Sequence, residues 1–106
     1  MLDDAIDAEQ IGPEFVPRLR EPVAAIPVAD EAVLYEEDIG RLHQLNPTGA
    51  AVCGFIDGDT PLESMIGALA SRYGMEPAEI RDDVVEMVRA LGRKGLLNGV
   101  RTDEQA

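Results

Sequence analysis

Residues 45–57, Leu-Asn-Pro-Thr-Gly-Ala-Ala-Val-Cys-Gly-Phe-Ile-Asp, constrain the fold of this chain more than any other stretch. A short strand pattern ends at an apolar residue, and Asn46 followed by Pro47 breaks it. Asn is a favoured N-cap, and Pro fits the first helical position, where its missing N–H costs nothing. Apolar residues then recur at helical spacing, at Gly49, Val52, Cys53 and Ile56. The junction therefore separates a region of short strands from a region of helices.

Three short strand patterns precede the junction, at residues 23–28, 32–35 and 41–45. Pro27 cannot donate to a sheet ladder, so the first pattern predicts an edge strand. In the third pattern Arg41, His43 and Leu45 face one way, and Leu42 and Gln44 face the other. Such closely spaced strands predict an antiparallel meander.

Three helices are expected after the junction, the first ending at Asp57-Gly58-Asp59. The second begins at Thr60-Pro61-Leu62-Glu63, which has the pattern of a capping box with Pro at the first position, and it stops at Gly74. Its expected apolar stripe is Leu62, Ile66, Leu69 and Tyr73. The third helix is expected over residues 77–94, with the stripe Ile80, Val84, Met87, Val88 and Leu91.

With 106 residues the chain is long enough for one domain. We expect a flexible N-terminal tail over 1–21, a domain over 22–97 and a polar C-terminal tail over 98–106. Because Ile11, Phe15 and Val16 are apolar, an N-terminal arm docked on the domain is the alternative to the tail. The expected fold is α+β and winged-helix-like, with a three-stranded antiparallel sheet followed by three helices.

The charge of the chain disfavours two classes of partner. Its 21 acidic and 9 basic residues give a formal net charge of −12, which repels phosphate backbones and anionic lipid surfaces. The single cysteine forms no intramolecular disulfide and is compatible with a reducing compartment. The N-terminus lacks the pattern of a signal peptide, and no apolar run has the length of a membrane span. We therefore expect a cytoplasmic protein that binds neither nucleic acid nor membrane.

No set of residues with catalytic spacing can be assembled from the sequence. One histidine, His43, and one cysteine, Cys53, do not make a zinc site, and nothing in the pattern brings them together as a nucleophile and its base. The glycines do not form a phosphate-binding loop, and the acidic clusters lack the periodicity of a calcium loop. We expect no enzymatic activity, no cofactor and no metal.

Two features indicate binding. If residues 41–45 form a sheet edge, their unpaired N–H and C=O groups can accept an added strand. Beside them, Val85 lies between Arg81 and Arg89 on the flank of the third helix, which suits the wall of a groove. The alternative is that Val85 is the edge of the core and the arginines form pairs along the helix. Both interpretations are open at this point.

Four motifs in order resemble the PqqD family. They are Gly-Arg-Leu-His-Gln-Leu-Asn-Pro-Thr-Gly-Ala-Ala-Val-Cys at 40–53, Asp57-Gly58 with Thr60, Leu69 with Tyr73, and the pattern from Asp83-Val84 to Gly95-Leu96-Leu97. The resemblance covers about residues 22–97. The family usually has Trp where Cys53 stands, and a common Phe is replaced by Met87. Both departures look like changes in the core.

The resemblance implies a peptide chaperone of the kind that serves pyrroloquinoline quinone synthesis, lasso-peptide and other radical-SAM peptide pathways. In this family the leader of a ribosomally made precursor lies as a fourth strand on the third strand of the module. The module then presents the peptide to a modifying enzyme, a radical-SAM enzyme or a leader peptidase, which supplies the chemistry. Carried onto this chain, the peptide-binding residues are Arg41, Leu42, His43, Gln44 and Leu45 of the strand, and Arg81, Val85, Val88 and Arg89 of the third helix.

Two alternatives belong to other classes. A winged-helix DNA-binding regulator shares the topology, but Asp82, Asp83 and Glu86 stand on the third helix where a recognition helix needs basic and amide side chains. The other alternative is a dimerisation module, a homodimer in which edge strands or tails pair between copies.

Overall fold

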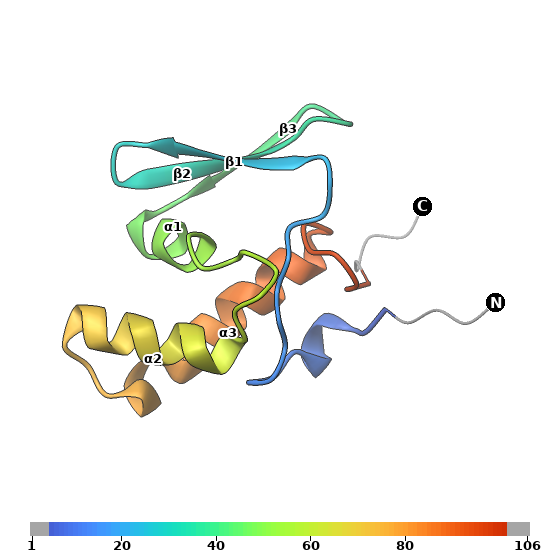
Figure 1. The fold of residues 1–106 in the computed structure, drawn as a ribbon. Helices are drawn as coiled ribbons and strands as arrows, with labels where there is room; N and C mark the ends of the chain where they lie inside the picture. Colours follow the sequence, from blue (N-terminus) through green and yellow to red (C-terminus); the bar gives the residue numbers. More distant parts are fainter. Residues whose placement is uncertain (1–4, 102–106) are drawn as a thin grey trace.

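The computed structural model describes residues 5–101 and places one sheet above a layer of helices (Figure 1). The antiparallel sheet has the order β1-β2-β3, with β1 at Val23–Val28, β2 at Glu31–Glu36 and β3 at Arg41–Leu45. The helices are α1 (Pro47–Cys53), α2 (Leu62–Tyr73) and α3 (Pro77–Arg93), and a 3₁₀ turn, η1 (Ala8–Gln10), precedes the sheet. The predicted α+β order of three strands and three helices is confirmed.

The sheet has one face toward the helices and one away from them. Along β2, Ala32, Leu34 and Glu36 are buried, whereas Val33 and Tyr35 between them are only half-buried. Successive side chains of a strand point to opposite faces, so the even-numbered residues face the helices. Leu34 has no exposed surface and packs into the main core with Val52, Leu62 and Leu69.

Helix α1 begins as predicted and ends earlier. The Asn46 side chain accepts a hydrogen bond from the Gly49 N–H at 2.8 Å, with Pro47 in the first helical position. The helix stops at Cys53, before the predicted Asp57. The Asp57 carboxylate instead forms a turn of its own, in which it accepts the N–H of Asp59 at 2.9 Å and that of Thr60 at 2.8 Å.

The start of α2 differs from the predicted capping box. The Thr60 hydroxyl donates to Asp57 at 2.9 Å, and Pro61 stands in the N-cap position without a side-chain cap. The first N–H groups of the helix are satisfied from far away in the sequence, since Leu62 N–H donates to the carbonyl of Phe15 and Glu63 N–H to that of Pro13, both at 2.8 Å. Tyr73, expected in the core stripe, is 46% exposed at the last helical position.

Residues 5–21 pack against the helices, which differs from the flexible tail expected over 1–21 and agrees with the docked arm. Ile11 is fully buried and Ala8 is 2% exposed, both against α3. Isolated bridges join Ile6 to Val100 and Leu19 to Leu97. The packed unit therefore extends beyond residues 22–97 in both directions; residues 1–4 and 102–106 of the expected tails lie outside the described part.

Within residues 5–101, none of the helices combines the length and the apolar character that a membrane crossing requires.

Candidate functional site: the free edge of β3 and the neighbouring flank of α3

Strand β3 is an edge of the sheet. Along residues 5–101 it pairs with β2 alone, so one of its two sides carries no ladder. The other edge, β1, contains Pro27, which has no N–H to offer to an added strand. Of the two edges, β3 is therefore the better acceptor.

The register shows which residues of β3 offer their main chain. Val28 and Glu31 flank a two-residue turn, which closes on a hydrogen-bonded pair, so Val33 and Tyr35 also bond toward β1. This alternation leaves Pro27, which has no donor, on the outward side of β1, as its chemistry requires. The even-numbered residues of β2 then bond to β3.

The partners of those even-numbered residues are Arg41, His43 and Leu45. Their main-chain groups are used within the sheet. Because the hydrogen bonds of an antiparallel strand alternate in direction, the N–H and C=O groups of Leu42 and Gln44 point to the free edge. These two residues are the ones that can pair with a peptide.

On the helix-facing side of β3, a buried carboxylate fixes the side chains. Glu36 is 2% exposed, and His43 Nε2 lies 2.6 Å from its Oε2. Arg20 Nη2 donates to Glu36 at 2.8 Å, and Arg41 Nε is 3.5 Å away. Burial by itself raises the pKa of this carboxyl, but the hydrogen bonds from His43 and Arg20 and the charge of Arg41 outweigh it, so the pKa of Glu36 is lowered.

Arg20 also ties the sheet to the end of α3. Its Nε donates to the carbonyl of Gly95 at 2.8 Å, just after the helix, while its Nη1 pairs with Asp38 at 3.2 Å in the β2–β3 turn. The same guanidinium thus contacts β2, the β2–β3 turn and the segment just after α3.

The structure does not bring the predicted helix residues to the β3 side. Arg89 Nη2 donates to the carbonyl of Ile11 at 2.9 Å, so this residue faces the N-terminal arm. Val85 and Arg81 lie one and two turns before Arg89 on the same stripe and therefore share that side. Val88 has no exposed surface and belongs to the core. Arg89 and Val88 are thus engaged by the arm and the core, whereas the role of Arg81 and Val85 in peptide binding stays a prediction.

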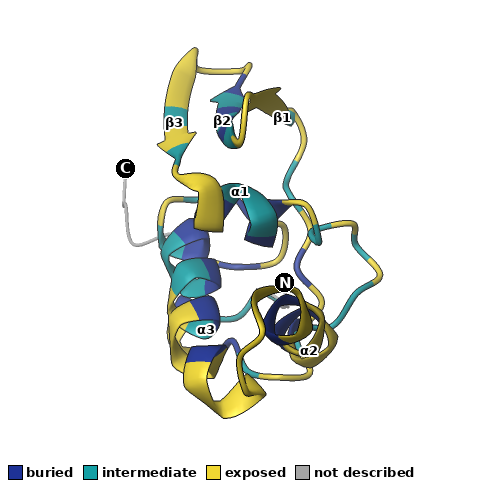
Figure 2. Ribbon diagram, turned by 90° about the vertical axis from the view of Figure 1, so that its left-hand side faces the viewer, coloured by how far each residue is buried: buried dark blue, intermediate teal, exposed yellow. Residues whose placement is uncertain are grey.

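The opposite flank of α3 lies toward the start of α1. Asp83 and Met87, one turn apart, line a hollow of about 320 Å³ together with Thr48 of α1. The rest of its wall is mostly apolar: Leu69, Tyr73, Met75, Ile80 and Val84. Figure 2 shows β3 and α3 along the same side of the molecule, with the start of α1 between them. Thr48, just after the end of β3, is the lining residue nearest to that strand in the sequence.

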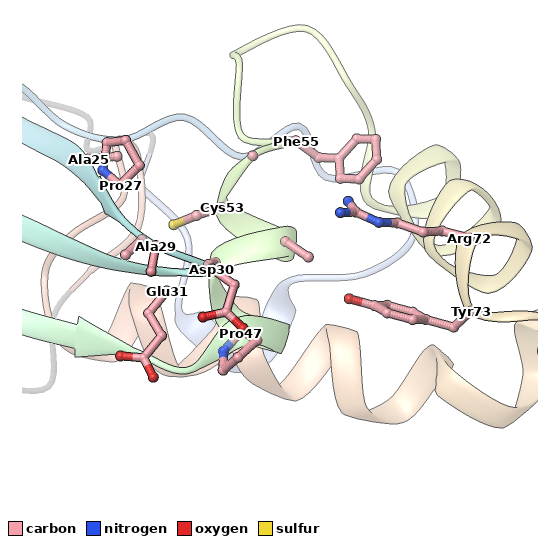
Figure 3. A pocket seen from close by; sticks show the side chains of 14 residues that line it. Ala25, Pro27, Ala29, Asp30, Glu31, Pro47, Cys53, Phe55, Arg72 and Tyr73 are labelled. Carbon is pink, nitrogen blue, oxygen red and sulfur yellow. The ribbon is translucent and has the colours of Figure 1, made fainter.

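A second hollow, of about 530 Å³, opens between the β1–β2 hairpin, α1 and the end of α2 (Figure 3). Arg72 and Tyr73 reach toward it from α2, and Asp30 and Glu31 lie at its other side. Cys53 lines it and is 8% exposed; burial raises the pKa of this thiol to about 11, so it is protonated at neutral pH. Such a thiol is a poor nucleophile and a poor metal ligand.

Among the residues that the structure describes, no group of three or more His, Cys, Asp or Glu side chains converges in the way that a metal ion needs.

The sequence profile described as "Coenzyme PQQ synthesis protein D (PqqD)" matches residues 31–97. This chain belongs to the PqqD family. The match begins at β2 and ends just after α3, so it includes β3 and the whole lining of the hollow beside Asp83 and Met87, and it leaves out β1 and the N-terminal arm. A comparison with curated proteins finds no significant match.

Solved structures carry the same fold. The PqqD truncation of Methylobacterium extorquens PqqCD, described as a functional, stand-alone recognition element for ribosomally synthesised and post-translationally modified peptides, has a TM-score of 0.73 at 25% identity, over 86% of this chain and 97% of that one. Lasso peptide synthetase B1 complexed with its leader peptide has a TM-score of 0.67 at 26% identity, over 79% and 99%. TbiB1 in complex with the TbiA(beta) leader peptide has a TM-score of 0.70 at 23% identity, over 77% and 95%, which shows the fold.

The sequence predicted the strand of the candidate site, and its role in peptide binding stays a prediction. The bounds and the facing of β3 agree with its alternation pattern. The hollow beside Asp83 and Met87 was not predicted, because their flank of α3 could be distinguished from the other only by knowing where the arm docks. The sequence contains one indication of the docked arm, the apolar residue Ile11. An arm docked on one flank of α3 leaves the other flank available.

Proposed function

We propose that this chain is a non-catalytic chaperone that binds the leader of a ribosomal precursor peptide and presents it to a modifying enzyme. The observation that carries the proposal is the free edge of β3, where Leu42 and Gln44 offer main-chain groups within a PqqD fold. Strand addition to such an edge gives affinity through the main chain and specificity through alternate side chains. The similarity to lasso peptide synthetase B1 and to the Methylobacterium recognition element supports the proposal that this chain binds a leader peptide.

The added peptide strand places every second side chain toward the helices. Those side chains meet the hollow of Asp83, Met87 and Thr48, whose apolar walls suit aliphatic or aromatic residues. Asp83 at the rim favours a basic group beside them. The contacts on α3 in this proposal are thus Asp83 and Met87, in place of Arg81, Val85, Val88 and Arg89.

The chemistry in this proposal belongs to the partner, a radical-SAM enzyme or a leader peptidase, acting in the cytoplasm. A lone buried thiol of raised pKa and a histidine held by Glu36 give this chain no nucleophile with a base beside it. DNA regulation is not supported, because Asp82, Asp83 and Glu86 are exposed along α3.

Proline substitutions on the two sheet edges test the proposal. Gln44→Pro removes an N–H that points to the free edge of β3 and leaves the ladder to β2 intact, so we expect peptide affinity to fall about tenfold or more while the fold persists. The matched control is Ala25→Pro, which removes an outward N–H from the β1 edge and leaves peptide affinity unchanged. The measurement is a titration of a fluorescent precursor peptide, encoded beside the gene, into each folded variant.

Equal affinity of Gln44→Pro and wild type would rule out strand addition at β3. Failure of the wild-type chain to bind the precursor at about tens of micromolar would contradict the function itself. His43→Pro is a further check on the register, since its N–H bonds to β2 and its loss should destabilise the sheet.

A further inference from the structure

The outer face of the sheet is exposed and apolar, although no element of the described chain covers it. All three helices lie on the other face (Figure 1). The outward residues form rows across the strands, in which Ile26 pairs with Val33, and Tyr35 with Leu42. Ile26, Val28 and Leu42 are 44%, 53% and 64% exposed, and Val33 and Tyr35 are half-buried beside them.

A solvated face of an antiparallel sheet ordinarily alternates to polar residues. Here the outer face carries an apolar patch, defined by Ile26, Val28, Val33, Tyr35 and Leu42. Its polar margin is the pair Gln44 and Glu31, in which the Gln44 amide donates to the Glu31 carboxylate at 3.2 Å. Contiguous apolar patches on a protein surface mark contact sites, because leaving them in water costs free energy. The patch is therefore an interaction surface.

The patch is continuous with the proposed peptide site. Leu42 belongs to both, because its side chain lies in the patch while its main chain points to the free edge. A peptide strand on β3 would turn its other alternate side chains outward and extend the rows of the patch by one strand. A protein that docks on the outer face thus contacts the module and the bound peptide together.

The charges around the patch distinguish between two possible occupants, a second copy of this chain and a different protein. Asp30 and Glu31 stand at the hairpin end, and Glu37 stands at the other end, in the β2–β3 turn. Two copies stacked face to face would bring these acidic ends together in either orientation, on chains that each carry a net charge of −12. A partner with an apolar surface between basic residues is complementary to both features.

We infer that the outer face of the sheet is the docking surface for the modifying enzyme. The enzyme contacts the module and the added peptide strand there at the same time. This inference rests on the proposed function. It predicts that the enzyme binds the peptide-loaded module more tightly than the empty one, by about tenfold, since coupled sites typically differ by 5–150-fold.

The test uses Ile26→Lys/Val28→Lys on β1, two strands away from the peptide edge. Burying the added lysine charges costs free energy, and these charges repel the basic residues proposed for the surface of the enzyme. We therefore expect affinity for the enzyme to fall about tenfold or more. The matched control is Val16→Lys, at an apolar residue of the arm that is 38% exposed. The milder Ile26→Thr/Val28→Thr keeps β-branched residues and repeats the test if the lysine variant does not fold.

Enzyme binding is measured with the purified modifying enzyme encoded beside the precursor gene, with and without peptide. Peptide binding is titrated separately without enzyme, so a failure of the proposed function appears there first. Loss of enzyme binding with unchanged peptide affinity supports the inference. Unchanged enzyme binding in the lysine variant overturns the inference. A wild-type chain that is dimeric in light scattering, together with a monomeric lysine variant, also overturns it, because a second copy would then occupy the face.

Discussion

The buried carboxylate of Glu36 fixes side chains on β3, the strand with the free edge. It lies at the end of β2 and holds Arg20 from the arm, and both His43 and Arg41 from β3. A buried carboxylate is tolerable only when such partners compensate for its lost hydration. The side chains of the edge strand are thereby fixed before any peptide arrives, which lowers the entropic cost of strand addition.

Replacing this carboxylate should destabilise the fold. Glu36→Gln leaves Arg20 and Arg41 without their shared charge, and we expect a loss of about 2–3 kcal/mol, reduced from the usual range for broken buried pairs because the arginines are partly exposed. Urea denaturation at neutral pH measures it. The neighbouring Glu37→Gln, at an exposed residue, is the control and should change the free energy of unfolding by less than about 0.5 kcal/mol.

The same residue gives a pH dependence of known sign. The pKa of Glu36 is lowered in the folded state, so its stabilisation is fully present above the ordinary value of 4.5 and is lost as pH falls through the lowered value. The difference in unfolding free energy between wild type and Glu36→Gln should therefore shrink in acid. A difference that stays constant from neutral pH into acid would show that the ion pairs do not stabilise the fold.

At the level of elements, the N-terminal arm explains most of what sequence reasoning missed. Its carbonyls at Pro13 and Phe15 cap α2, and Ile11 covers one flank of α3. Strand alternation and helical stripes are local patterns and predicted the elements well. The arm lacks a pattern of its own, since it takes its conformation from distant partners.

The arm should also contribute strongly to stability. Ile11 is fully buried, so Ile11→Ala should cost about 2–4 kcal/mol through lost burial and the cavity left behind. Val16→Ala, at a residue 38% exposed, should cost far less. Thermal and urea melts compare the two variants. Equal, small effects would mean that the arm is loosely attached in solution.

The caps show a second limit of local reasoning. Thr60 had the pattern of an N-cap, but Asp57 three residues earlier takes its hydroxyl at 2.9 Å. Two short polar side chains near one helix start compete for the same role, and the sequence pattern alone does not rank them.

For the whole molecule, the net charge of −12 separates the proposed function from the DNA-binding alternative. We expect no shift of a DNA duplex in a gel at low ionic strength, where electrostatic binding is strongest. The precursor peptide, bound in the same buffer, is the positive control. A shift that added salt abolishes would revive the alternative.

The two ends of the described chain are hydrogen-bonded to each other. Ile6 N–H donates to Gly99 O at 3.0 Å, and Arg101 N–H donates to Ile6 O at 2.8 Å. These bonds close the packed unit, because the first and the last described segments hold each other in place, and loss of either one should loosen the other.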